Sequence, residues 1–555
     1  MHLAAMHIDN FLAIRAASLH FDDTTVLIGE NNSGRSSVLE ALALVLQPPQ
    51  GDADFDFQPF HFHRTSAKRS GGPLRIELVF RERQPGEWGK LQSIFPPRLF
   101  KKRGHGPREL ILEVSARSGG SRRRLEVEWT VRSPGAPKLQ NNRPVLDALR
   151  RHSPLLRVLA HPVPAMVPRN AARVDSNSVD APNDDSPLAA KVRDLYQRLF
   201  DGTTLDRSRE LQAGFEAARD LLSRAGARAN PAISGRDAAL AEILGRGRAP
   251  SPLLTPQSWK HGTAAHQIGL LLLAGAFLEA IGEDLAPGAD PILVIEDPEA
   301  HLHPMTLAVV WDLIDNIRFQ KIVGTHSGVL LSRAPLHEVR RLTRCRGIVT
   351  ESRVSEGTLT RDELRKFTYH VRAHRGEATF ARCWLLVEGE TEFWLLPEFA
   401  RVRGYDLPAE GIACVEYAQC GLEPLLRAAE GLGIRWHVLA DGDEAGQGYA
   451  RAARAFVSGD NAPKYLTLLQ EHDIEHCMWR YGYADVYLRG AGLDPARSQK
   501  LPAKSVIAQA IDRSSKPFMA LEVLGAVVEP NSPGVPPPLQ QAIETCVRLA
   551  RTAGG

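Results

Sequence analysis

The sequence predicts an α/β protein in which a P-loop nucleotide-binding head is followed by a second α/β domain. Near the N-terminus, a glycine-rich loop at 29–37 lies between a short apolar run and an amphipathic helix. Much later, the apolar run Ile292–Ile295 ends directly in two acids. From Arg382 onwards, short apolar runs alternate with helical segments, and acids follow two of these runs. This alternation of strand and helix patterns is typical of α/β folds.

A chain of 555 residues is long enough for two or three domains, each with its own core. We expect the head to occupy residues 1–163 and 251–375, and the second domain to occupy 380–555. Between the two parts of the head, residues 164–250 read as a linker and a helical insertion. The sequence does not decide whether this insertion serves dimerisation or faces DNA.

Composition and charge restrict the class of protein only loosely. The net charge of +3 neither indicates nor excludes a nucleic-acid partner. The six cysteines form no CxxC pair, which favours reduced thiols. There is no secretory signal pattern and no apolar run of the roughly 20 residues that a bilayer span requires. We therefore expect a cytoplasmic protein with no membrane partner.

The N-terminal part of the head is predicted to be rich in strands. Apolar and polar residues alternate between residues 7 and 28, which fits two or three short strands. The last of them, Thr24–Ile28, leads into the glycine-rich loop. Three further strands are predicted at Leu74–Phe80, Glu109–Val114 and Leu125–Val131.

The loop has the G-x-x-x-x-G-x-S spacing of a P-loop, with Arg35 where lysine is expected. Gly29 and Gly34 let backbone N–H groups approach phosphate oxygens, and Ser36 offers a hydroxyl to Mg²⁺. The following helix directs its positive end at the same place. We favour this interpretation over a tight turn rich in Gly and Asn. The predicted nucleotide-binding residues are Gly29, Asn31, Asn32, Ser33, Gly34, Arg35, Ser36 and Ser37.

Glu296 and Asp297 follow the apolar run that starts at Ile292. A buried strand holds its end rigidly, so carboxylates there can keep Mg²⁺ in a fixed geometry. Glu296 is the predicted metal and nucleotide ligand, and Asp297 is the predicted catalytic acid of the head. A further strand is predicted at Phe319–Gly324, and His326 after it is a candidate γ-phosphate contact.

In the second domain, acids follow predicted strands of one sheet. The strands are Cys383–Val387, Ile412–Tyr417 and Trp436–Ala440, with helices at Phe393–Phe399 and Leu422–Leu432 between them. Such sheets place their functional sites at the carboxyl ends of the strands.

Glu388 follows the first of these strands, and Asp441 and Asp443 follow the third. Carboxylates that converge in this way repel one another unless cations lie between them, and hard oxygen ligands suit Mg²⁺ or Mn²⁺. Two such ions roughly 3.5–4 Å apart can activate water and stabilise the leaving oxygen of a phosphodiester. The alternative is a solvated acidic rim.

The head resembles the ABC-type ATPases of the RecF and SMC group. The residues that carry this resemblance are Ile8–Phe11, Gly29–Ser36, Glu296–Glu299 and Thr325–Ser327. It implies that ATP binds between two protomers, and hence a homodimer or a higher assembly. Most such heads carry Glu at the position of Asp297. Because Arg35 also departs from the pattern and guanidinium does not replace ammonium at a packed site, hydrolysis is expected to be weak or absent.

An acidic strand end followed downstream by D-x-D resembles a Toprim domain. A Toprim domain behind a RecF/SMC-like head resembles the OLD (overcoming lysogenization defect) family of ATP-dependent nucleases, most of all its class 2 members. The resemblance implies that Asp473 and Glu475 are extra metal ligands and that Lys516 is a cation that stabilises the transition state. Glu392, one helical turn after Glu388, is a secondary candidate ligand.

These features together predict a metal-dependent DNA endonuclease regulated by an ABC-type ATPase dimer. The resemblance implies a setting in DNA repair or phage defence, with a helicase-like or defence protein as a further partner. The rival hypothesis is a non-catalytic, ATP-gated DNA-binding clamp resembling RecF, whose acids hold structural Mg²⁺.

Overall fold

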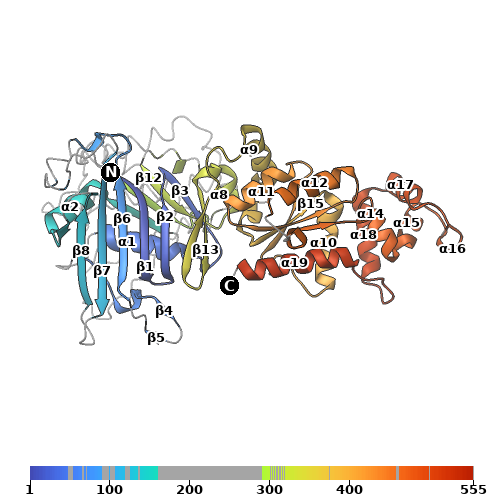
Figure 1. The fold of residues 1–555 in the computed structure, drawn as a ribbon, viewed down its shortest axis with the longest axis horizontal. Coiled ribbons are helices and arrows are strands. Elements are labelled where there is room, and N and C mark those ends of the chain that lie inside the picture. Colours follow the sequence, from blue (N-terminus) through green and yellow to red (C-terminus); the bar gives the residue numbers. More distant parts are fainter. Residues whose placement is uncertain are drawn as a thin grey trace, which may run out of the picture. The chain divides into compact units, whose positions relative to one another are not determined.

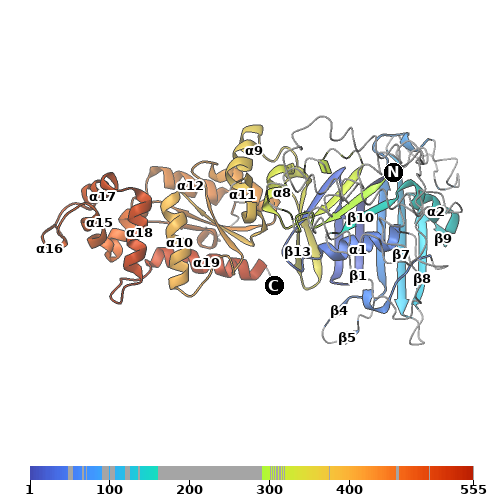
Figure 2. The same ribbon diagram turned by 180° about the vertical axis from the view of Figure 1, so that it is seen from behind.

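The computed structural model describes two units of the chain (Figures 1 and 2). One comprises Met1–Ala334 with Arg346–Glu351, and the other Pro335–Cys345 with Ser352–Gly555. The described residues are 1–47, 54–65, 68–69, 72–89, 95, 99, 107–118, 125–134, 138–159, 290–300, single positions from 302 to 317, 319–373, 376–457, 462–498 and 500–553. The predicted linker and helical insertion at 164–250 lie outside these residues.

One half of the sheet in the first unit is an antiparallel meander. β1 (His2–Phe11) pairs with β2 (Ile14–His20) on one side and with β6 (Leu74–Arg81) on the other. The series continues through β7 (Glu109–Ser118) and β8 (Leu125–Arg132). The predicted strands are confirmed here, but β1 begins at His2, five residues before the alternation that predicted it. The smaller elements nearby are β4 (Arg64–Thr65), β5 (Lys68–Arg69), β9 (Leu139–Gln140), β14 (Ile348–Ser352), η1 (Pro59–His61), η2 (Glu87–Gly89) and α2 (Arg143–His152).

The other half of this sheet is parallel and carries the predicted nucleotide site. Its strands run in the order β10 (Leu155–Leu159), β11 (Ile292–Glu296), β12 (Gln320–Gly324) and β3 (Thr24–Ile28). β3 and β12 are buried along their whole length, as expected for parallel strands covered on both faces. Their carboxyl ends are level, because Glu296 pairs with Gly324 and Gly324 with Leu27. α1 (Arg35–Leu46) follows β3, and α8 (Gly328–Arg333) follows β12.

The second unit is built on a parallel sheet in the order β16 (Ile412–Glu416), β15 (Cys383–Val387), β17 (Arg435–Ala440) and β18 (Leu466–Leu468). Side chains of β15 alternate between two cores, because successive residues of a strand point to opposite faces. Cys383, Leu385 and Val387 enter one core, while Trp384 and Leu386 enter the other.

Helices cover both faces of this sheet (Figure 1). α10 (Glu390–Val402), α18 (Lys516–Val527) and α19 (Pro537–Ala553) contribute to the core of one face. α11 (Leu422–Gly431) and α12 (Glu444–Ala455) contribute to the core of the other. The predicted strands and helices of this region are therefore confirmed, whereas β18 was not predicted. The remaining elements are η8 (Leu336–Glu338), β13 (Val339–Cys345), α9 (Arg361–Phe367), η9 (Thr368–Ala373), η10 (Gly376–Phe380), α13 (Ala462–Tyr465), α14 (Ile474–Met478), η12 (Trp479–Tyr483), α15 (Ala484–Gly490), α16 (Pro495–Ser498) and α17 (Ala503–Arg513).

In the part of the chain that is described, none of the helices combines the length and the apolar character needed to cross a bilayer.

Candidate functional site

Glu388 and Asp441 lie at neighbouring strand ends of the second unit. Leu386 of β15 pairs with Val438 of β17, so Glu388 is level with Ala440 and Asp441 follows one residue later. Strand order reverses between β15 and β17, since the chain goes from β15 outward to β16 and then returns to the far side of β15. Such a reversal is where open α/β sheets bind ligands.

The electrostatics of these acids show that the structure brings them together. Burial raises the pKa of Asp441 from 3.8 to about 9, and the charges of Glu392, Glu388, Asp473 and Glu475 add to the shift. Burial also raises the pKa of Glu388, with Asp443 as the next cause. Carboxylates that raise one another's pKa in this way form a local excess of negative charge that favours a bound cation.

Two glycines allow the chain to carry acids so close together. A Cβ on Gly446 would lie 2.0 Å from the carbonyl oxygen of Asp441, and a Cβ on Gly442 would lie 2.2 Å from that of Glu471. Asp443 caps α12, since its Oδ1 accepts a hydrogen bond of 2.7 Å from the N–H of Gly446. The D-G-D-x-x-G spacing is the sequence signal for these glycines, whereas the prediction of the site rested on the two acids alone.

Glu392 and Glu475 are both buried beside the strand ends. Burial raises the pKa of Glu392 to about 7, and its Oε2 accepts a hydrogen bond of 3.2 Å from the N–H of Gly389. Glu475 is 2% exposed and accepts a hydrogen bond of 3.2 Å from Thr391 Oγ1. Lys516 Nζ lies 3.3 Å from Glu475 Oε1. Burial opposes the charge of Lys516, yet its contacts with Glu475 and other acids raise its pKa.

Asp473 is engaged by its own segment of the chain. Its Oδ1 accepts hydrogen bonds from the N–H of His476 at 2.8 Å and from His476 Nδ1 at 2.6 Å, which caps α14. His472 stacks on His476 with ring centroids 5.6 Å apart. This histidine contact was not predicted, although an Asp followed three residues later by His was a visible signal in the sequence.

The acids suit a divalent ion chemically, but they do not surround one point. Among the described residues, no three His, Cys, Asp or Glu side chains are placed to hold a metal as they stand. Glu388 Oε2, however, is buried and lacks a hydrogen-bond partner. A buried, unpartnered carboxylate oxygen is costly unless a cation or donor reaches it. The hard oxygen donors of Glu388 and its neighbours therefore fit Mg²⁺ or Mn²⁺.

In the first unit, the glycine-rich loop between β3 and α1 has the backbone of a phosphate cradle. Gly29 has φ 156°, Asn32 has φ 73° and Gly34 has φ 101°. A Cβ on Gly34 would also lie only 3.0 Å from Val349 Cγ2, so glycine is required there. Asn31, Asn32 and Ser36 are exposed, whereas Ser33 and Ser37 are buried. The exposed Ser36 hydroxyl is therefore open to a ligand.

Arg35, predicted to bind phosphate, is held by the end of β12 in the absence of nucleotide. Its guanidinium is buried, donates to the carbonyl oxygen of Thr325 and contacts His326 Nε2. It also lies 3.9 Å from Asp297. Burial lowers the pKa of His326, and the charge of Arg35 lowers it further. Glu299 completes this cluster, because it accepts hydrogen bonds from Thr325 Oγ1 at 2.9 Å and from the N–H of His326.

Glu296 and Asp297 lie where β11 ends, as predicted, but each has a partner within the chain. Glu296 Oε2 lies 3.0 Å from Arg157 Nη2 of β10. Asp297 adopts the left-handed region with φ 48°, and its N–H donates to the carbonyl oxygen of Gly324 at 2.8 Å. A non-glycine residue in this region is strained and marks the turn as a constrained position.

The fold and these residues define a P-loop ATPase-type head joined to a parallel sheet with an acidic edge. A family model described as "Protein of unknown function (DUF2813)" matches residues 1–378, and one described as "Overcoming lysogenization defect protein-like, TOPRIM domain" matches residues 379–443. The "Uncharacterized protein YbjD" of Escherichia coli (strain K12) is 33% identical over 577 residues and is matched over 99% of each chain. The chain therefore belongs to the DUF2813 family, and its second unit contains an OLD-like Toprim domain, which confirms the resemblance to the OLD family.

Solved structures of low identity are also similar to parts of the chain. The C-terminal region of the Burkholderia pseudomallei OLD protein is 17% identical, with a TM-score of 0.27, and the match covers 31% of this chain and 99% of that one. The C-terminal region of the Xanthomonas campestris pv. campestris OLD protein is 19% identical, with a TM-score of 0.25, and the match covers 31% of this chain and 95% of that one. The SMC head domain from Thermotoga maritima is 13% identical, with a TM-score of 0.30, and the match covers 64% of this chain and 100% of that one.

The Toprim match divides the predicted site residues into two groups. Glu388, Glu392, Asp441 and Asp443 lie within residues 379–443. The other three, Asp473, Glu475 and Lys516, follow that stretch. Their place beside Asp441 and Glu392 comes from the packing of α14 and α18, which the matched stretch does not include.

Proposed function

We propose that this protein is a metal-dependent DNA endonuclease whose Toprim sheet hydrolyses phosphodiesters and whose head, as part of a homodimer or higher assembly, controls cleavage through ATP. The observation that carries the proposal is the buried, unpartnered Glu388 Oε2 beside Asp441, whose pKa is raised to about 9. A fold tolerates such an arrangement when a bound cation offsets its cost.

Each acid has a role in this proposal. Glu388, Asp441 and Asp443 would hold Mg²⁺ or Mn²⁺, with Glu392, Asp473 and Glu475 as further ligands. The ions, when bound, lower the pKa of water and neutralise charge on the phosphodiester. Lys516, fixed by Glu475 at 3.3 Å and 56% exposed, can still direct its ammonium towards a scissile phosphate.

The head would hold the phosphates of ATP with residues 29–37, and a magnesium ion with Ser36 and Glu296. Asp297 would orient water, and His326 would contact the γ-phosphate. Because Arg35 and Glu296 already have partners within the chain, nucleotide has to displace these contacts. Weak hydrolysis is therefore part of the proposal. The proposal also includes a cytoplasmic setting, a role in DNA repair or phage defence, and a helicase-like or defence protein as a partner.

A non-catalytic, ATP-gated DNA clamp is the second candidate. One observation favours it, since Asp443 and Asp473 cap helices and Glu392 binds the backbone of Gly389, which a purely structural role would explain. The unpartnered oxygen of Glu388 suits a bound cation in either candidate, and the Toprim match over residues 379–443 favours the nuclease.

The test is cleavage of supercoiled plasmid by the full chain in Mg²⁺ or Mn²⁺, with and without ATP. Asp441→Asn and Glu388→Gln should abolish nicking. Glu398→Gln is the matched control, because Glu398 lies on α10 but pairs with Arg401 at the surface. If wild type and the two site variants nick equally, the nuclease assignment is wrong. DNA retention without any nicking by the wild type would favour the clamp.

A further inference from the structure

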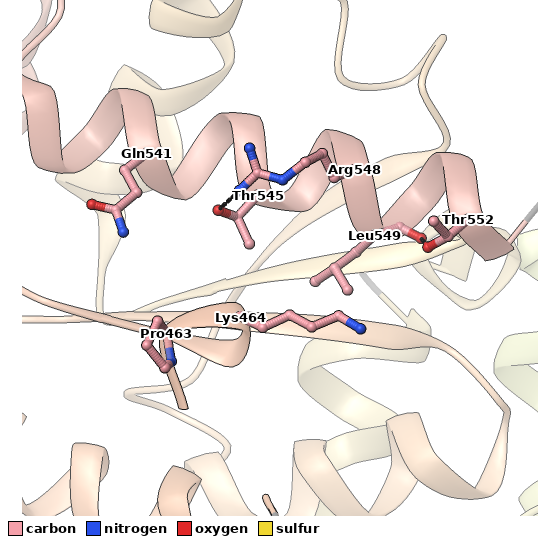
Figure 3. A pocket seen from close by; sticks show the side chains of 7 residues that line it. All are labelled: Pro463, Lys464, Gln541, Thr545, Arg548, Leu549 and Thr552. Carbon is pink, nitrogen blue, oxygen red and sulfur yellow. Dashed lines mark hydrogen bonds between the residues drawn. The ribbon is translucent and has the colours of Figure 1, made fainter. Parts of the chain in front are cut away.

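A hollow of about 430 Å³ lies between α19 and the short segment that precedes β18 (Figure 3). Lys464 approaches it from that segment, and Gln541, Thr545, Arg548 and Thr552 approach it from α19. These four residues of α19 recur at helical spacing and form one face, while Ala542, Ile543 and Cys546 of the same helix pack into the core.

The hollow lies at the opposite end of the sheet from the acids. Lys464 precedes β18, and Val438 of the parallel β17 pairs with Leu466. Lys464 lies in the short helix α13 beside the beginning of β17, where its carbonyl oxygen is 3.0 Å from His437 Nδ1, whereas Asp441 comes after the last residue of β17. Five residues of strand span about 17 Å, so this is a separate place on the domain.

The two cations of the hollow are not neutralised. Among the described residues no acid lines it, and neither Lys464 nor Arg548 makes an ion pair with any of them. Arg548 Nη2 donates to Thr545 Oγ1 at 2.7 Å, which is an uncharged acceptor, and Lys464 Nζ lies 5.5 Å from the ring centroid of Tyr465. The guanidinium and the ammonium thus keep their full charge beside two threonine hydroxyls.

The next arginine of α19 shows the contrast. Arg551 donates to both carboxylate oxygens of Glu410, one of these bonds measuring 2.9 Å. Glu544, which is the only acid of α19, lies 3.4 Å from Arg403 and so is also paired. Charge on this second face of the helix is internally balanced, whereas charge on the face with Arg548 is not.

A buried histidine fixes the wall that carries Lys464. His437 of β17 is fully buried, with Nδ1 3.0 Å from the carbonyl oxygen of Lys464 and Nε2 2.9 Å from Thr467 Oγ1. Burial lowers the pKa of His437 to about 4, so the ring is neutral at pH 7 and can donate one hydrogen bond and accept the other. The backbone at Lys464 is therefore held in place before any ligand arrives.

We propose that this hollow binds a phosphate group through Lys464 and Arg548. A guanidinium and an ammonium on facing walls of one hollow, beside hydroxyls, are the kinds of group that recognise phosphate oxygens. The phosphate belongs either to a DNA backbone or to a free phosphorylated molecule. In the first case the inference deepens the proposed nuclease function, since about 17 Å corresponds to about five nucleotides at 3.4 Å per strand, and one DNA molecule can reach both places.

The DNA arm measures binding of a fluorescent duplex to the full chain in EDTA, where no metal-dependent cleavage occurs. The variant Lys464→Ala with Arg548→Ala should bind at least about tenfold more weakly, and the salt dependence of log K should fall by about 2, one for each lost phosphate contact. Arg551→Ala should bind like the wild type, because Glu410 already neutralises that guanidinium. The single variant Arg548→Lys, which keeps the positive charge at this position, should retain most of the DNA affinity of the wild type.

The small-molecule arm measures the rise in melting temperature caused by inorganic phosphate or pyrophosphate. If the double variant loses this rise but binds DNA normally, the ligand is a free phosphorylated molecule. If it loses DNA affinity and the salt dependence falls, the ligand is the DNA backbone. If neither DNA binding nor the phosphate-induced shift depends on Lys464 and Arg548, the proposal is wrong. Because neither arm involves cleavage, a failure here is distinguishable from a failure of the nuclease assignment.

Discussion

Replacement of Asp441 by asparagine should stabilise the metal-free protein. The unfolded chain releases the Asp441 proton near pH 3.8, whereas the folded chain keeps it until about pH 9. Between these values the folded state binds more protons, so its stability falls as the pH rises, and above pH 9 the loss is constant. Asparagine does not ionise and therefore removes this loss.

The size of the effect follows from the shift in pKa. At pH 7, about three pH units above the unfolded-state pKa of 3.8, the loss in free energy of unfolding caused by Asp441 is at most about 4 kcal/mol, at about 1.4 kcal/mol per unit of pH. Partial solvent access and the sharing of the repulsion with Glu392 reduce the expected gain to about 2 kcal/mol. For a domain of roughly 150–250 residues, this corresponds to a rise of about 4–8 °C in melting temperature.

The assay is thermal unfolding of the full chain from pH 6 to 9, in EDTA and then in Mg²⁺. In EDTA, Asp441→Asn should melt above the wild type, and the difference should widen with pH. Mg²⁺ should raise the melting temperature of the wild type and leave that of the variant nearly unchanged. The difference between the two melting temperatures should therefore shrink or change sign. Glu398→Gln serves as the control. A variant that is no more stable than the wild type in EDTA would refute the argument that these acids repel one another.

Three further substitutions test other parts of the structure. Arg35→Lys frees the end of β12, because lysine cannot bind both Thr325 and His326, and it should tighten ATP binding by about tenfold, as measured by nucleotide titration. Gly446→Ala places a Cβ 2.0 Å from a backbone oxygen and should cost about 3 kcal/mol of stability in denaturant unfolding, together with the loss of nicking. Lys516→Met should slow nicking by about a hundredfold while DNA binding in EDTA is retained, and equal nicking rates would exclude a role for its charge.

The strands of both sites were predictable because each is a short apolar run that ends abruptly in acids or glycine. Cys383–Val387 agrees with β15 to the residue, and Thr24–Ile28 agrees with β3. Burial on both faces makes a parallel strand largely apolar, so its limits are visible in the sequence. Glu388 and Asp441 then meet because neighbouring parallel strands end at the same edge.

The partners of long side chains were not predictable in the same way. Arg35 was expected to reach phosphate, but its guanidinium lies against Thr325 and His326, which are almost three hundred positions away in sequence. Lys516 meets Glu475 only because α18 and α14 pack into the same core, and Lys516 was placed there through a family resemblance and not through spacing. Such contacts depend on tertiary packing and on rotamers, neither of which a local pattern contains.

The two candidate sites differ in how far the chain satisfies its own charges. In the head, Arg35 and Glu296 each find a partner of complementary charge or a hydrogen-bond acceptor nearby, so that site is stable without a ligand. In the Toprim sheet, Asp441 is surrounded by further acids, and the charge of Lys516 only partly offsets the rise in the pKa of Glu388. Folding therefore leaves an electrostatic cost at the acidic edge that a divalent ion relieves, whereas nucleotide has to compete with contacts already made. Under the proposed function, metal is therefore the ligand that offsets the cost of the acidic edge, and ATP is the ligand that must compete with contacts already made in the head.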